Sequence, residues 1–184
     1  MNFIVDGPDG VGKTEIAKEM SHRYMFDYFK MNSEIDNWQG KKFKEELLFG
    51  ERRQMQLIHQ LGIEMVQDRG YPSEWVYSRV LGRETDDGFL YDVDSFYAAH
   101  ETLIVMPLMR NYDLARKDDL VERPLLERLH DTYLDFEEWT ECHVVKMYVD
   151  ELGFSINAEM AFLEDELKRT WPSFHGNLEA WKKW

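Results

Sequence analysis

Eight residues near the start of the chain could hold a polyphosphate. The stretch Gly7-Pro8-Asp9-Gly10-Val11-Gly12-Lys13-Thr14 fits the pattern G-x-x-x-x-G-K-[ST] without a mismatch. The glycines allow positive φ angles and a close approach of the backbone, whose N–H groups then form a concave anion site. Lys13 supplies positive charge to the outer phosphates, and Thr14 offers a hydroxyl to Mg²⁺. We call residues 7–14 the phosphate loop, and we predict that its phosphate-binding residues are Gly7, Asp9, Gly10, Val11, Gly12, Lys13 and Thr14.

Two further groups follow predicted strands. Asp68-Arg69-Gly70 ends an apolar run, where an aspartate can hold Mg²⁺ through water and an arginine can bind an oxyanion with two hydrogen bonds. The alternative is a local ion pair at a strand end, but the phosphate loop favours the functional interpretation. Glu34 follows the second predicted strand and could accept a proton from an attacking hydroxyl. A helix-entry or solvated carboxylate is an equal alternative for Glu34.

A charged segment follows the fourth predicted strand. Five of the 22 basic residues of the chain fall within positions 110–128, interleaved with acidic residues; they are Arg110, Arg116, Lys117, Arg123 and Arg128. One interpretation is a solvated helix with ion pairs between neighbouring turns. The other is a mobile lid whose arginines close over the transferring phosphoryl group. The position between a strand and a long helix favours the lid.

Aromatic residues could line a pocket that stacks a base. Trp38 and Tyr77 are equally compatible with a pocket and with the core, whereas Trp75 fits the core better. Gln56 could pair with a base edge, but a surface position is favoured. The six histidines are scattered without cysteine partners, which argues against a zinc site.

Strands and helices alternate along the chain, so the sequence predicts an α/β fold with a parallel sheet and right-handed crossovers. Ligands bind at the carboxyl ends of the strands in such sheets, which is where the residues above fall. The expected strands are 2–6, 26–31, 63–67, 102–106 (stopped by Pro107) and 143–149. We expect one helix directly after the phosphate loop, two helices within 38–61 that are separated near Phe49-Gly50, and a helix that begins at Pro72. After a surface loop at 83–88, we expect a short helix through 92–97 capped by Asp92, a helix that ends near Trp139, and a last helix over 157–170.

Composition narrows the class of protein. The 184 residues suit a single domain spanning 1–184, and 43% of them are apolar. One cysteine, Cys142, excludes an internal disulfide framework and makes a reducing cytoplasm the expected setting. We expect no membrane span and no signal peptide. The net charge of −14 disfavours a nucleic-acid substrate, although a local basic cleft is compatible with it.

Taken in order, these motifs resemble the thymidylate kinase and deoxynucleoside kinase superfamily of phosphate-loop kinases. The resemblance implies a five-stranded parallel sheet with helices on both faces and a helical lid at about 110–128. In thymidylate kinases an acidic third residue of the loop, here Asp9, touches the acceptor sugar, and the arginine matching Arg69 holds the acceptor side. Tyr77 falls near the base pocket of that family. The residues from Arg116 to Tyr133 are similar to the lid and following helix of deoxynucleoside kinases, whose glutamate base Glu34 would match without the usual Glu-Pro dipeptide.

We therefore expect an ATP-dependent phosphotransferase that moves the γ-phosphoryl group to a deoxynucleoside monophosphate, with ATP and Mg²⁺ as cofactors. The expected catalytic residues are Lys13, Glu34, Asp68, Arg69, Arg116 and Arg123. The acceptor would contact Asp9, Trp38, Arg69 and Tyr77, and Mg²⁺ would be held by Thr14 and Asp68. The family also implies a possible homodimer, and a short, acidic, tryptophan-rich chain would suit a viral enzyme.

Three alternatives stay open from the sequence. A deoxynucleoside kinase with a 5′-hydroxyl acceptor would depend on Glu34 as the base. A kinase of a hydroxylated modified base in DNA would act on a single-stranded or flipped nucleotide. A phosphate-loop ATPase or switch would bind the nucleotide without an acceptor, and neither a guanine-reading Asn-Lys-x-Asp motif nor a suitably placed Asp-x-x-Gly is present.

Overall fold

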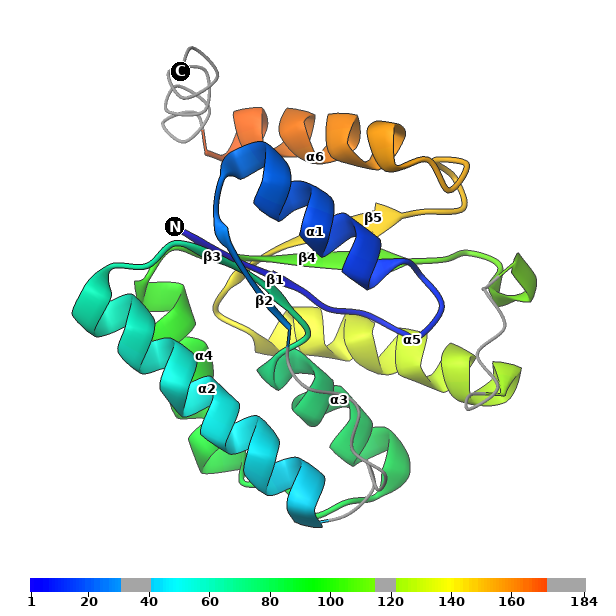
Figure 1. The fold of residues 1–184 in the computed structure, drawn as a ribbon. Helices are drawn as coiled ribbons and strands as arrows, with labels where there is room; N and C mark the ends of the chain where they lie inside the picture. The colour runs from blue at the N-terminus through cyan, green and yellow to red at the C-terminus, as the bar shows by residue number, and fades with distance from the viewer. Residues whose placement is uncertain (31–40, 115–121, 172–184) are drawn as a thin grey trace.

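A computed structural model describes residues 1–30, 41–114 and 122–171, with only the helical backbone for 41–48. Five parallel strands form one sheet in the order β2-β3-β1-β4-β5 (Figure 1). The strands are β1 Asn2–Val5, β2 Asp27–Lys30, β3 Met65–Asp68, β4 Thr102–Leu108 and β5 His143–Tyr148. This architecture confirms the predicted α/β fold with a five-stranded parallel sheet.

Helices cover both faces of the sheet, as predicted. Helices α1 (Lys13–Tyr24) and α6 (Ile156–Thr170) pack together on one face (Figure 1). The other face carries α2 (Lys41–Leu61), α3 (Tyr71–Leu81), α4 (Asp87–Ala99) and α5 (Arg123–Trp139). Because helices shield both faces, every residue of β1, β3 and β4 is buried, which explains why these strands are largely continuous apolar runs.

Strand register brings the candidate residues to one edge of the sheet. Val5 lies opposite Asp68 of β3 and opposite Val105 of β4. The phosphate loop therefore leaves the centre of the sheet beside the turn that contains Arg69. This common edge is the carboxyl end of all five strands, where ligands bind in folds of this kind.

Three sequence-based boundaries were wrong. Helix α2 runs without a break through Phe49-Gly50, because one helical glycine costs only about 1 kcal/mol and the turns that follow bury Glu51, Gln54 and Ile58. Strand β4 continues through Pro107, which pairs with Met147 of β5, to Leu108. Helix α4 begins at Asp87, within the predicted loop, because the Asp86 carboxylate accepts a hydrogen bond from the Phe89 N–H at 3.0 Å; Asp92 is not its cap.

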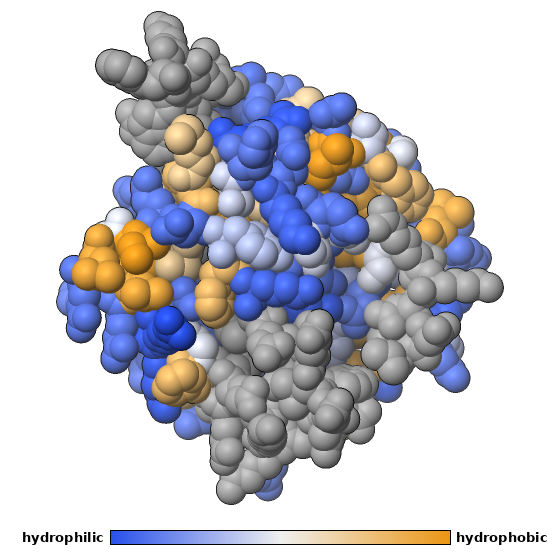
Figure 2. Space-filling model, viewed as in Figure 1, coloured by the Kyte–Doolittle hydropathy of each residue, from blue (hydrophilic) through white to orange (hydrophobic). Residues whose placement is uncertain are grey.

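The surface seen in Figure 2 is mostly hydrophilic, with apolar residues in separate groups. The large exposed apolar side chains are spread along the chain; they are Met25, Phe49, Leu61, Tyr91, Leu114 and Phe154. No helix in the described part of the chain combines the length and the apolar character needed to cross a membrane.

Candidate phosphate-transfer site

The phosphate loop has the backbone conformation that its glycines predict. Gly10 and Gly12 have φ angles of 80° and 84°, in the left-handed region that favours glycine. Gly12 directly precedes α1, so the first N–H groups of this helix face the loop and favour an anion there. Gly7 is required for a different reason: a Cβ on it would lie 2.5 Å from the carbonyl oxygen of Pro107.

The side chain of Lys13 folds back over the earlier residues of the phosphate loop. Its ammonium donates a hydrogen bond to the Pro8 carbonyl oxygen at 2.5 Å and lies 3.4 Å from Asp9 Oδ1. Burial, together with the positive charge of Arg69, lowers the pKa of Lys13 to about 8 although nearby carboxylates raise it. The lysine is therefore poised over the loop, where an incoming phosphate would offer it a stronger partner than a carbonyl oxygen.

Arg69 and Tyr77 converge on the carboxylate of Asp9. Arg69 forms an ion pair with Asp9 Oδ1, and the Tyr77 hydroxyl donates to Asp9 Oδ2 at 2.7 Å. Burial alone would raise the pKa of Asp9, but the positive charges of Lys13 and Arg69 outweigh it and hold this pKa below its usual range. Arg69 has a φ of 67°, an uncommon conformation for a side chain of this size. The structure thus brings together three residues that the sequence assigned to the acceptor.

Thr14 and Asp68, which the sequence assigned to Mg²⁺, are also adjacent. The Thr14 hydroxyl donates to Asp68 Oδ2 at 2.7 Å, and the Tyr28 hydroxyl donates to the same oxygen at 2.9 Å. Mg²⁺ prefers oxygen ligands and is usually held by one or two protein groups together with water and phosphate oxygens. The donor set at this corner of the loop therefore fits Mg²⁺. No cluster of three or more metal-binding side chains occurs in the described ranges.

Asp6 is a site residue that sequence reasoning missed. Its buried carboxylate accepts hydrogen bonds from both sides of the site: from the N–H groups of Gly7 (2.8 Å), Gly70 (3.1 Å) and Ser73 (2.9 Å), and from the hydroxyls of Ser73 (2.8 Å) and Tyr133 (2.8 Å). Burial raises the pKa of Asp6, and the surrounding cations and hydroxyl donors oppose that rise. Asp6 links the phosphate loop to the Arg69 turn and to α5. The sequence feature that could have identified Asp6 is its position, because it is a charged residue at the end of the apolar run 2–6.

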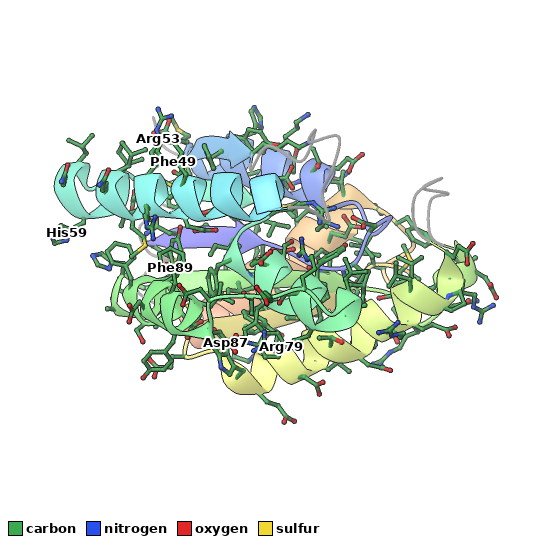
Figure 3. All side chains as sticks on the ribbon, turned by 90° about the horizontal axis from the view of Figure 1, so that it is seen from below. Phe49, Arg53, His59, Arg79, Asp87 and Phe89 are labelled. Carbon is green, nitrogen blue, oxygen red and sulfur yellow. The ribbon has the colours of Figure 1, made fainter. Side chains whose placement is uncertain are left out.

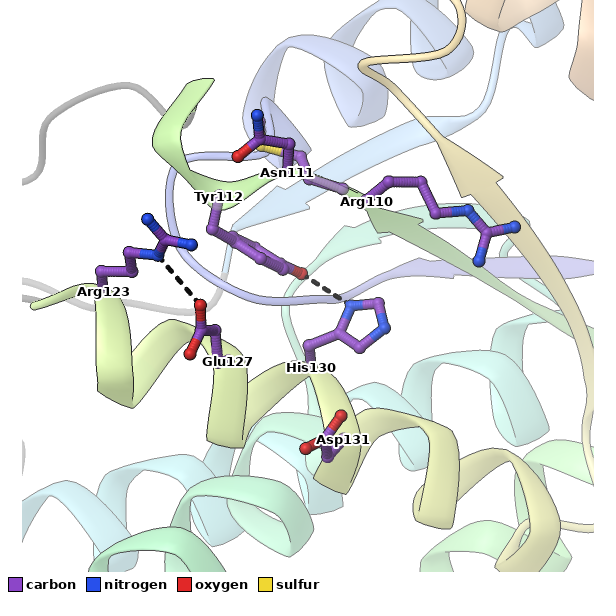
Figure 4. Close-up of a pocket in the computed structure, with 8 residues that line it drawn as sticks. Arg110, Asn111, Tyr112, Arg123, Glu127, His130 and Asp131 are labelled. Atoms are coloured by element: carbon purple, nitrogen blue, oxygen red, sulfur yellow. Dashed lines mark hydrogen bonds and ion pairs between the residues drawn. The ribbon is translucent and has the colours of Figure 1, made fainter.

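Other predicted site residues do not join this cluster. Glu34, Trp38 and Arg116 lie outside the described residues. Arg123 is exposed at the start of α5 and pairs with Asp113 and, at 2.9 Å, with Glu127. It borders a hollow of about 170 Å³ between the end of β4 and α5, which Figure 4 shows with Arg110, Asn111, Tyr112, Glu127, His130 and Asp131.

Part of the expected lid is fixed to the body of the protein. Arg110 lies 3.5 Å above the ring of Tyr148 and donates to Glu151 at 3.1 Å. Arg128 donates to the carbonyl oxygen of Val80 at 2.6 Å, which ties α5 to α3. The 110–128 segment contains a short 3-10 helix (Tyr112–Leu114) and the start of α5, and residues 115–121 lie outside the described ranges. Arg110 and Arg128 thus contact β5 with the turn after it and α3, respectively, and neither forms a hydrogen bond with the phosphate loop in the described residues.

The burial of the side chains shows where Trp75, Gln56 and Tyr77, the described candidates for a base pocket, lie in the fold. Trp75 is buried among Phe136 and Trp139, with ring centroids 5.5 Å away in each case, which confirms its place in the core. Gln56 is exposed on α2, as the surface interpretation predicts. Tyr77 lies between core and site: its ring is buried, but its hydroxyl reaches Asp9.

Comparison with solved structures identifies proteins of the same fold. The YorR protein from Bacillus subtilis, in complex with phosphorylated GDP, shares 16% identity over 92% of this chain and 98% of its own, with a TM-score of 0.67. Deoxyadenosine kinase from M. mycoides with bound dATP shares 16% identity over 91% and 100% of the two chains, with a TM-score of 0.63. Thymidylate kinase from Candida albicans shares 14% identity over 91% of each chain, with a TM-score of 0.56.

No protein-family model and no curated protein sequence matches the chain. The solved structures nevertheless confirm the predicted fold of phosphate-loop nucleoside and nucleotide kinases. At these identities the likeness establishes the fold, and the chemistry has to be argued from the residues of the site.

Proposed function

We propose that this protein is an ATP-dependent kinase that transfers the γ-phosphoryl group to the phosphate of a deoxynucleoside monophosphate. One observation carries the proposal. The lysine of the phosphate loop and the arginine of the β3 turn reach the same carboxylate: Lys13 lies 3.4 Å from Asp9 Oδ1 and Arg69 pairs with that oxygen. A cation suited to a donor phosphate and a cation suited to an acceptor phosphate are therefore neighbours at one edge of the sheet.

The donor side consists of the loop N–H groups, Lys13 and the α1 N-terminus. These groups bind the β- and γ-phosphates, and Lys13 exchanges the Pro8 carbonyl oxygen for a phosphate oxygen. Thr14 and Asp68, whose side-chain oxygens are 2.7 Å apart, would hold Mg²⁺ between them, and the ion would supply positive charge against the phosphate oxygens.

The acceptor side consists of Arg69, Asp9 and Tyr77. Arg69 binds the acceptor phosphate through its planar guanidinium, which suits two parallel hydrogen bonds to phosphate oxygens. Asp9 and Tyr77, already joined at 2.7 Å, bind the sugar. During transfer the bond between the γ-phosphorus and the bridging oxygen of ADP breaks, and a bond to an acceptor phosphate oxygen forms. That oxygen is anionic at neutral pH, so the step needs no strong base.

A deoxynucleoside is the second candidate acceptor, because the deoxyadenosine kinase structure matches nearly the whole chain. A hydroxyl acceptor must lose a proton during transfer, so this reaction would require a base. Glu34 is the candidate for that base. The Glu34→Gln variant would then lose most of its turnover, whereas a monophosphate kinase would retain it.

The test is ADP release from ATP and Mg²⁺ with a panel of deoxynucleosides, deoxynucleoside monophosphates and oligonucleotides. We expect release with at least one monophosphate, and a loss of about a hundredfold or more in kcat/KM for Lys13→Ala. Lys18→Ala, which removes an exposed lysine from the same helix, is the matched control and should retain activity. Release without any acceptor would instead indicate an ATPase, and full turnover of Lys13→Ala would refute the proposal.

A further inference from the structure

Helix α2 contributes a buried carboxylate to the interior beneath the site. Glu51 is fully buried on the inward side of α2, opposite Phe49 and Arg53, whose outward positions are visible in Figure 3. No ion pair of Glu51 occurs among the described residues. A buried glutamate without a cationic partner is costly to keep charged, so the groups that hydrogen-bond to its carboxyl group must explain why it is buried here.

The hydrogen bonds of Glu51 lead to the turn that carries Arg69. Glu51 Oε2 lies 2.8 Å from the Tyr97 hydroxyl oxygen, within hydrogen-bond distance, and Oε1 accepts from Gln67 Nε2 at 3.0 Å. The carboxyl group also accepts from the backbone N–H of Tyr71, the first residue of α3. A Cβ on Gly70 would lie 3.0 Å from Glu51 Oε1, so only glycine lets the turn approach this closely.

Two buried acids thus cap the N-terminus of α3 in place of a local cap. Gly70, at the N-cap position, has no side chain to offer, and the Asp6 carboxylate accepts from the N–H groups of Gly70 and Ser73. Glu51 accepts from the Tyr71 N–H between them. The backbone that follows Arg69 is therefore held from two sides, which supports the left-handed conformation of Arg69.

Counting hydrogens shows that this network is complete only when Glu51 carries a proton. The Tyr97 hydroxyl has one hydrogen, but it lies near two acceptors: Glu51 Oε2 at 2.8 Å and Gln67 Oε1 at 3.1 Å. If Glu51 is ionised, the Tyr97 hydrogen goes to Glu51 and this bond to the Gln67 oxygen is lost. If Glu51 is protonated, it donates to Tyr97, Tyr97 donates to Gln67, and the Gln67 amide donates back to Glu51.

We propose that Glu51 is a positioning residue that, in its protonated form, closes a ring with Tyr97 and Gln67 and thereby fixes the Arg69 turn for binding the acceptor phosphate. The inference rests on the proposed function for the role of Arg69. Loss of the proton opens the ring beside Gly70 and places a negative charge in the interior. The acceptor is then held less well, while the donor site is unaffected.

The charged and titratable groups around Glu51 agree with this role. The Tyr97 hydroxyl faces it from α4, the backbone N–H of Tyr71 from α3 and the neutral Gln67 from β3, and the charge of Asp6, which follows β1, acts on it. Burial raises the pKa of Glu51 to about 7, partly opposed by its hydrogen-bond donors and reinforced by the charge of Asp6. Burial also raises the pKa of Tyr97 well above its usual value, so this hydroxyl keeps its hydrogen throughout the neutral range.

The first test compares acceptor KM between the wild type and Glu51→Gln from pH 6 to 8.5. The glutamine amide mimics the protonated acid. We therefore expect the wild-type KM to equal that of the variant at pH 6 and to exceed it by about fivefold at pH 8.5. At each pH the two proteins should have the same kcat. Dividing one KM by the other cancels titration of the acceptor itself. Glu138→Gln, which removes an exposed carboxylate from α5, should track the wild type.

The second test needs no activity, so failure of the proposed function is distinguishable from failure of this inference. The Nε–H resonance of Arg69 in the nucleotide-free protein, assigned with Arg69→Lys, should show a titration step near pH 7 in the wild type that Glu51→Gln lacks. The step near pH 8 that reports the neighbouring Lys13 should remain in both proteins. Tyr97→Phe removes the shared hydroxyl, a donor that lowers the pKa of Glu51, and should move the step near pH 7 to higher pH. A KM ratio independent of pH in an active enzyme, or an Arg69 signal that titrates identically in wild type and Glu51→Gln, would overturn the inference.

Discussion

Replacing Glu51 with Gln should make the protein more stable in neutral and alkaline solution. The wild-type carboxyl group is fully buried, and burial raises its pKa from 4.5 to about 7. The glutamine keeps the shape and the hydrogen bonds of the protonated acid but has no charge to bury. The substitution therefore isolates the free energy that the buried carboxyl group removes from folding.

The sign and size of this stability difference follow from the pKa of Glu51 in the unfolded chain and its pKa in the folded chain. Below pH 4.5 the acid is protonated in both the folded and the unfolded chain, so it adds no pH-dependent term. Between pH 4.5 and 7 the folded chain binds more protons than the unfolded chain, so the stability of the wild type falls as pH rises. The full penalty is present above pH 7: a shift from 4.5 to about 7 corresponds to about 3 kcal/mol at 1.36 kcal/mol per pKa unit.

The assay is urea unfolding followed by circular dichroism at pH values from 5 to 8.5. The difference in unfolding free energy between Glu51→Gln and the wild type should grow by about 2 to 3 kcal/mol over this range, in favour of the variant. Glu138→Gln provides the control for the same change in net charge at an exposed position. A difference that stays constant with pH would refute the reasoning, since only a Glu51 with the same pKa in the folded and the unfolded chain gives no such slope.

Three further predictions test the loop and its support. Gly7→Ala would bring a methyl group to 2.5 Å from the Pro107 carbonyl oxygen, and should lower the free energy of unfolding by about 1–3 kcal/mol. Tyr133→Phe removes a 2.8 Å hydrogen bond to the buried Asp6 carboxylate, and should lower it by about 1.5–3 kcal/mol in urea unfolding. Binding of ADP at pH 8.5 should take up protons, because phosphates raise the pKa of Lys13 from about 8, and titration calorimetry in two buffers measures this uptake.

Each of these predictions has a control in the same protein. At Gly88 an added Cβ would lie 3.5 Å from Asp86 Oδ1, an ordinary contact, so Gly88→Ala should change stability little. Tyr91 is an exposed tyrosine, and Tyr91→Phe should be close to neutral. Equal losses in the paired variants would show that the contacts invoked here carry no specific energy. Proton uptake that persists in Lys13→Arg would assign it to another group.

Local sequence patterns predicted the phosphate loop, the sheet and the positions of Lys13 and Thr14 at the start of a helix. Each depends on residues close in the chain: glycine spacing sets the φ angles of the loop, and alternating apolar runs set strand and helix order. The errors arose where distant contacts outweigh such signals. Gly50 stays helical because the turns of α2 after it are buried at Glu51, Gln54 and Ile58, and Pro107 stays within β4 because β5 pairs beside it.

The sequence by itself determined that a phosphate-binding turn precedes a helix and that Asp68 and Arg69 end a strand of the same sheet. Only the tertiary structure decided which groups surround them. Asp6 meets Ser73 and Tyr133, which lie 67 and 127 positions away, and Glu51 meets Tyr97 at 46 positions. Strand register and helix packing set these pairings. A polar helical residue that is buried in the fold cannot be distinguished, from the sequence alone, from one that faces water. The buried acids that hold the Arg69 turn therefore became visible only when the chain was folded.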